Sequence, residues 1–184
     1  MKLGLAAGKT QLVPYDPDWA ALFREEQIRL IGLLGPLILD IQHVGSTAIP
    51  ACLAKPILDL SISVADLQST DGLIQLLSNQ GWEFKGEAGI PGRHFLIKGP
   101  PAGRTHHLHI AEPFSRVRLN HINFRDCLIA HPDLVQQYND LKRGLAEQFA
   151  DDVETYTQGK AAFIQMVLAR AERDSRQAAP QAHH

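Results

Sequence analysis

The chain has 184 residues, of which 45% are hydrophobic and 21% charged, and its formal net charge is −2. This length fits one domain, and the apolar content can build a sizeable core, which argues against an intrinsically disordered chain. A net charge so close to zero provides no overall basic field for nucleic acid or an anionic membrane, although it allows a local basic pocket for one phosphate group.

The cysteines and the N-terminal segment indicate the cellular compartment. Cys52 and Cys127 have no CxxC spacing and make no disulfide framework, so they fit a reducing cytosol. Residues 1–11 have no apolar core of signal-peptide length, and no window approaches the ~18 apolar residues of a membrane helix. We therefore expect a cytoplasmic protein that has neither a membrane nor a nucleic acid as its partner.

The first predicted helix follows an extended lead-in at residues 13–15. Asp16 suits the N-cap of this helix, and Pro17 suits its first position. Apolar side chains then recur at helical spacing, with charged residues on the other face, until Gly35–Pro36. This pattern predicts an amphipathic surface helix that ends at that point.

Two strands are predicted next, at residues 37–44 and 57–64, joined by a loop with two prolines. The second strand is an apolar run whose one charged residue is Asp59, and such a run predicts burial on both faces of a sheet. Because side chains alternate along a strand, we expect Asp59 and Ser61 to point to the same side.

The rest of the chain mixes strands and helices without an internal repeat. The pattern predicts, in chain order, a helix at 69–79, strands at 82–85, 93–98 and 105–111, and helices at 118–130, 133–149 and from Thr155 or Thr157 to about 173. We expect the three strands to form a meander that extends the sheet. Strands followed by helices argue for an α+β fold, a mixed β-sheet with packed helices.

We expect one domain over residues 13–173. Residues 1–12 would form an N-terminal extension, and the polar residues 174–184 a disordered tail. The two histidines of that tail, His183 and His184, are set aside as metal ligands.

The turn Gly45–Ser46 ends the first predicted strand, and together with Asp59 in the second strand it suits nucleotide chemistry. Backbone N–H groups and a hydroxyl can hold a phosphate, while a carboxylate holds Mg²⁺ against it. In that case the turn and Asp59 lie in one pocket on adjacent strands. The alternative is a tight turn beside a structural carboxylate that is paired with Lys55 or a nearby arginine.

These residues resemble known sequence patterns. Val44–Gly45–Ser46, a spacer of twelve residues and then Asp59 within an apolar strand are similar to the signature of the nucleotidyltransferase superfamily. More closely, residues 43–50 (HVGSTAIP) and 54–59 (AKPILD) resemble the GrpB family, also called UPF0157. Weaker likenesses in 107–110 (HLHI), 124–126 (FRD) and the late Tyr and Lys motifs extend the resemblance over about residues 13–168.

The resemblance implies a nucleotidyltransferase-like fold and transfer of a nucleotidyl group. It departs at Ser61, which stands where an active nucleotidyltransferase has its second acid. With Asp59 as the one acid of the motif, either Glu112 or the histidines would complete the site, or catalysis is lost.

His107 and His109 lie two residues apart on the last predicted strand, so we expect them to share one face. Such a pair could bind a transition metal, or one ring could act as an acid or base. The alternative is a solvated strand face or a hydrogen-bonded structural pair. The resemblance places this face in the cleft of Asp59, and His43 would supply a third imidazole for a metal such as Zn²⁺.

Cationic residues could neutralise a triphosphate. Arg93 lies on the meander, where the alternative is a charged residue that protects an edge strand. Lys160 is four residues after Tyr156 and shares its helix face, which otherwise indicates an ordinary i,i+4 pair. The resemblance implies that these late helices help to hold the nucleotide, with Lys142 on one of them.

We therefore predict a GrpB-like nucleotidyltransferase that moves a nucleotidyl group from a nucleoside triphosphate, or acts on another phosphorylated small molecule, with an unknown small acceptor. The predicted catalytic residues are Asp59, His107 and His109. The predicted nucleotide or phosphate contacts are Gly45, Ser46, Thr47, Lys55, Arg93, Lys142, Tyr156 and Lys160. The predicted metal ligands are Asp59, His43, His107 and His109, for Mg²⁺ or, as an alternative, Zn²⁺ or another transition metal. Two other functions stay open, a non-catalytic nucleotide- or anion-binding module and a histidine-containing metal site with different chemistry.

Overall fold

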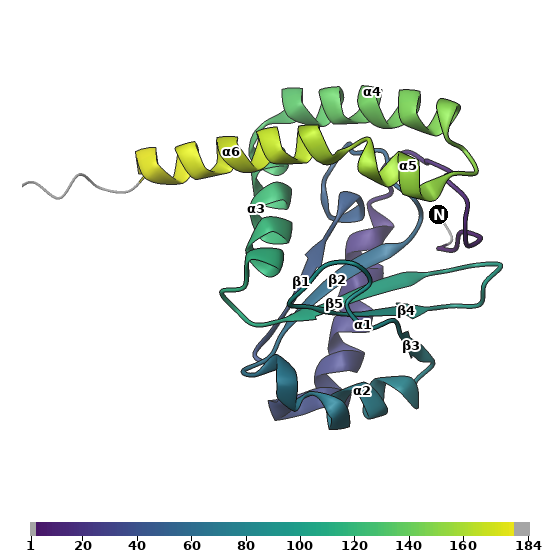
Figure 1. Cartoon of the computed structure of the whole chain (residues 1–184), viewed down its shortest axis with the longest axis vertical. Helices are drawn as coiled ribbons and strands as arrows, with labels where there is room; N and C mark the ends of the chain where they lie inside the picture. Colours follow the sequence, from purple (N-terminus) through teal and green to yellow (C-terminus); the bar gives the residue numbers. More distant parts are fainter. Residues whose placement is uncertain (1–2, 179–184) are drawn as a thin grey trace, which may run out of the picture.

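The computed structural model describes residues 3–178 of the chain. These residues form a five-stranded mixed sheet in the order β1-β2-β5-β4-β3, with helices packed against it (Figure 1). The strands are β1 (Asp40–Val44), β2 (Leu58–Ser63), β3 (Trp82–Phe84), β4 (His94–Lys98) and β5 (His106–Ala111). The predicted α+β fold is confirmed, including the meander that β3, β4 and β5 make by antiparallel pairing.

Six α-helices complete the described part of the chain. They are α1 (Asp18–Leu34), α2 (Asp71–Ser78), α3 (Arg116–Ala130), α4 (Pro132–Gln148), α5 (Val153–Gln158) and α6 (Ala161–Ala178). In Figure 1, α4, α5 and α6 lie above the sheet, α2 lies below it, and α3 connects the sheet to the upper layer. None of these helices is long and apolar enough to cross a membrane.

The ends of several elements differ from the prediction for local reasons. The strand predicted at 37–44 begins only at Asp40, because Gly35, with a φ of 48°, and Pro36 continue as a short 3₁₀ turn. The single helix predicted after Thr155 is broken into α5 and α6 at Gly159. A Cβ atom at this glycine would meet Leu145 Cδ2 at 2.5 Å, so α4 packs closely against the chain at the break.

Both predicted terminal segments contribute structure. Leu5 is buried and forms a β-bridge with Arg104, and the N–H of Gly4 donates to the Pro56 carbonyl at 2.9 Å. At the other end, residues 174–178 are the last part of α6 rather than a tail. Residues 1–2 and 179–184, with His183 and His184, lie outside the described residues.

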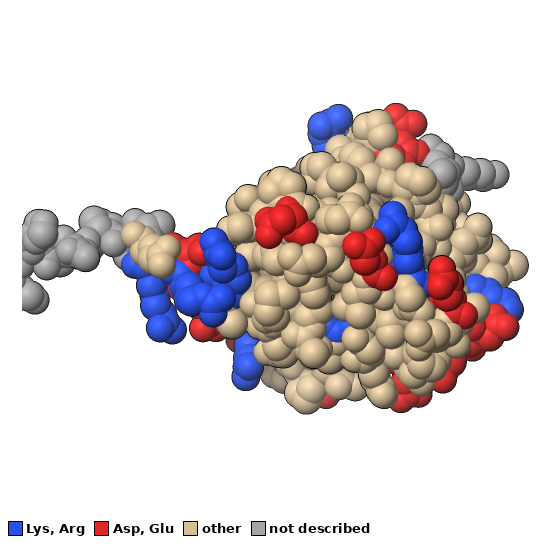
Figure 2. All heavy atoms as spheres, turned by 90° about the horizontal axis from the view of Figure 1, so that it is seen from above, with Lys and Arg blue, Asp and Glu red and all other residues tan. Residues whose placement is uncertain are grey.

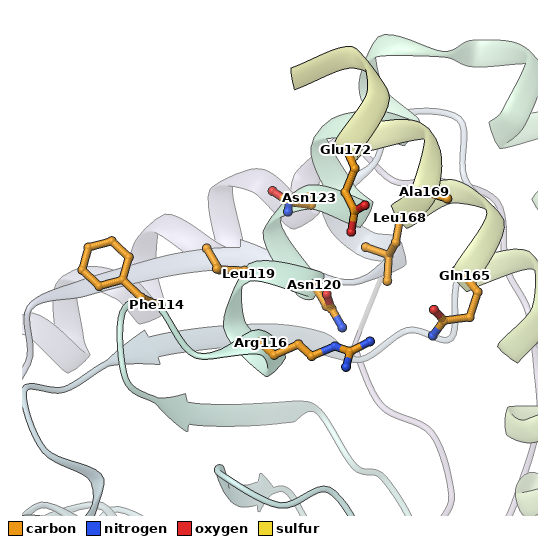
Figure 3. A pocket seen from close by; sticks show the side chains of 9 residues that line it. All are labelled: Phe114, Arg116, Leu119, Asn120, Asn123, Gln165, Leu168, Ala169 and Glu172. Carbon is orange, nitrogen blue, oxygen red and sulfur yellow. The ribbon is translucent and has the colours of Figure 1, made fainter. Parts of the chain in front are cut away.

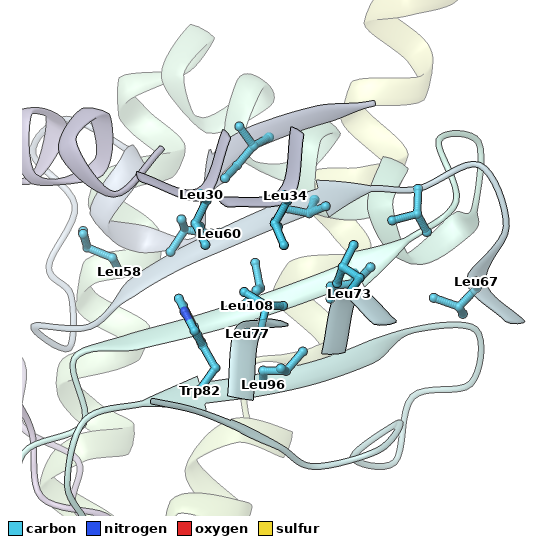
Figure 4. Packing of buried hydrophobic residues seen from close by; sticks show 14 of the residues in the cluster. Leu30, Leu34, Leu58, Leu60, Leu67, Leu73, Leu77, Trp82, Leu96 and Leu108 are labelled. Carbon is cyan, nitrogen blue, oxygen red and sulfur yellow. The ribbon is translucent and has the colours of Figure 1, made fainter. Parts of the chain in front are cut away.

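The sheet has two chemically different faces, because side chains alternate along each strand. Leu60 of β2 lies beside Leu108 of β5, and both face the core formed with α1 and α2. This core contains Leu30 and Leu34 of α1 and Leu73 and Leu77 of α2 (Figure 4). Trp19 of α1 is also part of it. The opposite face carries Asp59, Ser61, His107 and His109.

A second core lies in the helical layer on the polar side of the sheet. It joins Ile49 and Cys52 of the loop between β1 and β2 to the inner faces of α3, α4 and α6. Asn139 of α4 fixes the same loop, since its side chain accepts from the Leu53 N–H at 2.7 Å and donates to the Ala51 carbonyl at 2.9 Å. The space between the two cores is where a ligand site can form.

The edge strand β1 is tied to helices from both sides. The Gln27 side chain of α1 donates to the Ile41 carbonyl at 3.2 Å, and Arg125 of α3 donates to the His43 carbonyl at 2.8 Å. Arg125 also forms an ion pair with Asp126 at 2.7 Å, so this motif residue has a structural role. Seen from above the helical layer, charged residues of both signs are scattered among uncharged ones, with basic side chains gathered beside the outer part of α6 (Figure 2).

Candidate functional site

A cavity of about 660 Å³ lies between the sheet face that carries Asp59 and the helices α4 and α5. Its volume is within the range of about 300–1,000 Å³ that is typical of small-molecule sites. Of the twelve predicted site residues, eleven line this cavity and His43 does not. The eleven are Asp59, His107 and His109 of the sheet, Gly45, Ser46, Thr47 and Lys55 of the loop after β1, Arg93 before β4, and Lys142, Tyr156 and Lys160 of the helical layer.

Gly45 and Asp59 are in direct contact on adjacent strands. Val44 lies opposite Asp59 in the antiparallel register, and Gly45 then turns the chain with φ 70° and ψ −174°. A Cβ atom at Gly45 would lie 2.8 Å from Asp59 Cβ, closer than packed atoms allow. Only glycine combines this backbone conformation with so little space, and its presence lets the Asp59 carboxylate rest against the turn.

Asp59 and His107 form a hydrogen-bonded pair at the centre of the cavity. His107 Nδ1 lies 3.0 Å from Asp59 Oδ1, and His109 Nε2 lies 3.9 Å from the same oxygen. Burial alone would raise the pKa of Asp59, but the hydrogen bond from His107 and then the nearby His109 ring outweigh it and hold the pKa below its ordinary value. An ionised carboxylate only accepts, so His107 Nδ1 carries the proton and Nε2 is the nitrogen left for a ligand.

Arg93 sets the protonation of His109. Its Nη1 lies 2.9 Å from His109 Nδ1, and a guanidinium can only donate, so Nδ1 must accept. The proton of the neutral ring is then on Nε2, the atom that faces Asp59. Burial lowers the pKa of His109, and the charge of Asp59 offsets this only in part. Arg93 is itself held by the carbonyl groups of Glu87 at 3.1 Å and Ala88 at 3.3 Å.

A third cavity histidine, His121 of α3, was not predicted from the sequence. Its ring centroid lies 4.5 Å from that of His109, and its Nδ1 is buried without a hydrogen-bond partner. Burial and the nearby His109 lower the pKa of His121 to about 3, so the ring is neutral. The sequence signal that could have found it is helical spacing, because His121 is three residues after Arg118 and four before Arg125 and so shares their helix face. In the structure, both arginines bond to β1.

Three lysines line the helical side of the cavity. Lys142 Nζ lies 3.0 Å from Cys52 Sγ and 3.5 Å from Ser46 Oγ, and it also donates to the Leu53 carbonyl. Lys55 Nζ and Lys160 Nζ lie 4.9 Å and 4.6 Å from the centroid of the Tyr156 ring, as cation–π contacts. Burial, with the nearby charges of Lys55 and Lys142, lowers the pKa of Lys160 to about 8.

His43 is the predicted ligand that the fold places elsewhere. It lies opposite Leu60, not Asp59, and therefore points to the other face of the sheet. Its ring stacks on Phe23 of α1 with centroids 4.7 Å apart, and its Nε2 lies 2.9 Å from Thr47 Oγ1. Burial lowers the pKa of His43 to about 4. The predicted four-residue metal site is corrected accordingly, since the pleat separates His43 from the other three residues.

The donor set of the cavity is a poor match for Mg²⁺, because this ion prefers oxygen ligands and the side chains beside Asp59 on the sheet are histidines. Asp59 is the one carboxylate among the lining residues. Ser61 is completely buried beside His109, and its hydroxyl has no hydrogen-bond partner. Glu112, at the end of β5, accepts from the Leu67 N–H at 3.3 Å and does not line the cavity.

Two further features of the described residues lie outside the cavity. Cys127, His131 and Asp174 have potential ligand atoms within 4.8 Å of one another, and His131 and Asp174 form an ion pair at 3.5 Å that ties α6 to the start of α4. A smaller hollow between α3 and α6 is bordered by polar side chains and by the exposed Phe114 (Figure 3). Neither feature contains a predicted site residue.

The fold and the cavity define an α+β protein in which a mixed sheet and a helical layer enclose a cavity rich in cationic side chains. Four cationic side chains and one carboxylate line this pocket. The chain belongs to the GrpB protein family, whose pattern matches residues 9–170. The family resemblance predicted from residues 43–59 is thereby confirmed.

Three known proteins are similar to this chain. The UPF0157 protein YqkA of Bacillus subtilis (strain 168) is 39% identical over 165 residues, which are 90% of this chain and 48% of YqkA, so the chain spans about half the length of that relative. The crystal structure of conserved protein GrpB from Enterococcus faecalis is 34% identical, with a TM-score of 0.82, and the match covers 90% of this chain and 99% of that one. The Cid1 poly(U) polymerase matches at 15% identity with a TM-score of 0.46, over 73% of this chain and 44% of its own.

Proposed function

We propose that the cavity binds a nucleoside triphosphate and catalyses transfer of its nucleotidyl group to a small acceptor. The observation that carries this proposal is the meeting, in one cavity, of the glycine turn, four cationic side chains and the His107–Asp59 pair. A phosphate-rich ligand is the natural complement of this arrangement, because the cations exceed the single carboxylate.

The phosphate groups would bind at the helical side of the cavity. Lys142 is already held beside the Ser46 hydroxyl, and Lys55 and Lys160 flank Tyr156. These groups would neutralise the charge that develops on the leaving pyrophosphate, which is the main requirement of in-line nucleotidyl transfer.

His107 would act as the general base. Its Nε2 takes the proton from the acceptor as the acceptor attacks the α-phosphorus, the new bond to phosphorus forms, and the bond to pyrophosphate breaks. Asp59 holds the ring through Nδ1 and stabilises the imidazolium that results. The proton is thus retained on His107 until it is released to water.

The first experiment measures binding. The melting temperature of the protein is compared with and without ATP, GTP, CTP and UTP. A nucleotide that binds the folded state raises it by an amount that grows with the logarithm of the nucleotide concentration relative to its Kd. If none of the four nucleotides stabilises the protein, the proposal fails.

The second experiment measures pyrophosphate release with a panel of candidate acceptors. His107→Gln should reduce turnover by about 10²- to 10⁴-fold while nucleotide binding is retained, because a general base contributes about that much. His131→Gln, far from the cavity, is the matched control and should be fully active. Equal turnover in His107→Gln and wild type would refute the role of the base. Stabilisation by a nucleotide without pyrophosphate release from any acceptor would instead support the non-catalytic binding module.

A further inference from the structure

We infer that this cavity holds its phosphorylated ligand without a divalent cation, with Lys55, Lys142 and Lys160 supplying the positive charge and Asp59 serving as the partner of His107. The inference rests on the proposed function, because it concerns how the same cavity binds polyphosphate. It arises from the mismatch between the donor set of the cavity and the needs of Mg²⁺.

One oxygen of Asp59 is already engaged by the histidines, and the other lies close to the Gly45 turn. Oδ1 faces His107 at 3.0 Å and His109 at 3.9 Å. Oδ2 rests against Gly45, at the position that a Cβ atom of that residue would occupy. A metal bound at Oδ1 would compete with the histidine that the carboxylate orients, and it would find histidine nitrogens rather than further carboxylates beside it.

The position of the second acid offers no replacement ligand. Ser61 shares the face of Asp59, but its side chain is fully buried between β1 and β5, beside Gln42 and His109. A neutral hydroxyl in this place cannot contribute the charge that a second carboxylate gives a metal site. Gln42, its neighbour on β1, is engaged with Asp40 and Arg125.

The three lysines form a cluster without a directly paired carboxylate. Lys85 and Lys98, outside the cavity, are paired with Glu83 and Glu26, whereas none of the cavity lysines has an ion pair among the described residues. Burial is the largest cause of the lowered pKa of both Lys55 and Lys142. Asp59 is the one lining carboxylate that acts on Lys55, Lys160 and Arg93, so these partly buried cations have too little counter-charge. A polyanion would lower the cost of burying them.

A divalent cation would weaken the attraction between the polyanion and the lysines. Mg²⁺ bound to a triphosphate cancels part of the negative charge that the lysines attract, and it adds positive charge to a cavity that already has four cationic side chains. Free polyphosphate should therefore bind at least as tightly as its magnesium complex. This order of affinities is the reverse of that in a nucleotidyltransferase site with two acids. In such a site the metal is needed to offset the repulsion between the acids and the phosphates.

The test uses the full chain with ATP and inorganic tripolyphosphate, each titrated in excess EDTA and in excess Mg²⁺ by calorimetry. We expect both ligands to bind in EDTA with a Kd no higher than in Mg²⁺. Lys55→Gln and Lys160→Gln should each weaken binding about tenfold, which corresponds to one charge-assisted contact. Lys85→Gln, on the surface, is the matched control and should bind like the wild type.

The outcomes separate this inference from the proposed function. Binding that occurs only with Mg²⁺ would overturn the inference and leave nucleotide binding intact. Binding in EDTA that is unaffected in both cavity lysine variants would also overturn it. The absence of binding under both conditions would refute the proposed function itself. Lys142 is not substituted in this test, because it also holds the Leu53 carbonyl and its loss could disturb the fold.

Discussion

Replacing Gly45 by alanine should disrupt both the stability of the fold and the arrangement of the cavity. The residue has φ 70° and ψ −174°, a combination that is essentially restricted to glycine. The added methyl group would also lie 2.8 Å from Asp59 Cβ and Cγ, so the carboxylate would have to move. The residues around the turn, Val44, Thr47 and Ile49, are buried, which leaves the turn little freedom to relax.

Two costs add to the expected effect. The unfavourable backbone conformation costs about 1–3 kcal/mol, and the overlap with the Asp59 side chain adds about 1–3 kcal/mol of overpacking. The sum, about 2–6 kcal/mol, is a large part of the total of about 5–15 kcal/mol that stabilises a typical domain. Gly45→Ala should therefore unfold at much lower denaturant concentration, and it should lose ATP binding even where it is still folded.

Equilibrium urea unfolding measures the change in the free energy of unfolding, and Gly32→Ala is the matched control. Gly32 lies in α1, is exposed, and has open space around its Cα. Its replacement should stabilise the helix by up to about 1 kcal/mol. If Gly45→Ala unfolds within about 0.5 kcal/mol of the wild type, the contact between this turn and Asp59 is not as tight as we describe.

The buried hydroxyl of Ser61 and the lowered pKa of Lys160 give two further predictions. In urea unfolding, Ser61→Ala should be as stable as the wild type or up to about 1 kcal/mol more stable, because the Ser61 hydroxyl has no partner. Ser61→Asp should lose about 3 kcal/mol or more, because it buries a second charge near Asp59. A clear loss of stability in Ser61→Ala would instead reveal a hydrogen bond that we do not see. Lys160 has a pKa of about 8 in the folded protein against an ordinary 10.5. Between about pH 8 and pH 10.5 the unfolded chain therefore binds more protons at this residue than the folded protein does. The stability contributed by Lys160 should accordingly rise with pH across that window. The ammonium group of folded Lys160 loses its charge as pH rises through about 8, so the affinity for ATP should fall there. Lys160→Gln should flatten this pH dependence. An equal pH dependence in the variant and the wild type would show that Lys160 is not the group responsible.

Much of the fold and about half of the residues that line the cavity could be predicted, because the sequence patterns that indicate them are local. The spacing from Gly45 to Asp59 reflects a turn and the next strand, and both features are short-range. The alternation of His107 and His109 follows from the strand period alone, and it placed both on one face correctly. The family resemblance then supplied what periodicity cannot, namely that this face is the one that carries Asp59.

The remaining features depend on contacts between distant parts of the chain. His43 has the right residue type at the right strand end, but the register that pairs it with Leu60 is not visible in the sequence. His121 reaches the cavity only because Arg118 and Arg125 dock α3 against β1. The break between α5 and α6 falls at Gly159, where Leu145 of another helix packs closely, and a search for helical periodicity cannot detect that contact.

The hydrogen bonds from Gln27 and Arg125 to β1 affect how the chain behaves during its synthesis. An edge strand with free carbonyl groups can recruit a strand from another molecule, which is a first step towards aggregation. Here Gln27 and Arg125 occupy two of the carbonyls, and β3, at the opposite edge, has only three residues to offer. Gln27 precedes the sheet in the chain, but Arg125 follows all five strands. A ribosome-bound chain that has just released β5 therefore has a complete sheet with a half-protected edge, and emergence of α3 closes that edge against its neighbours.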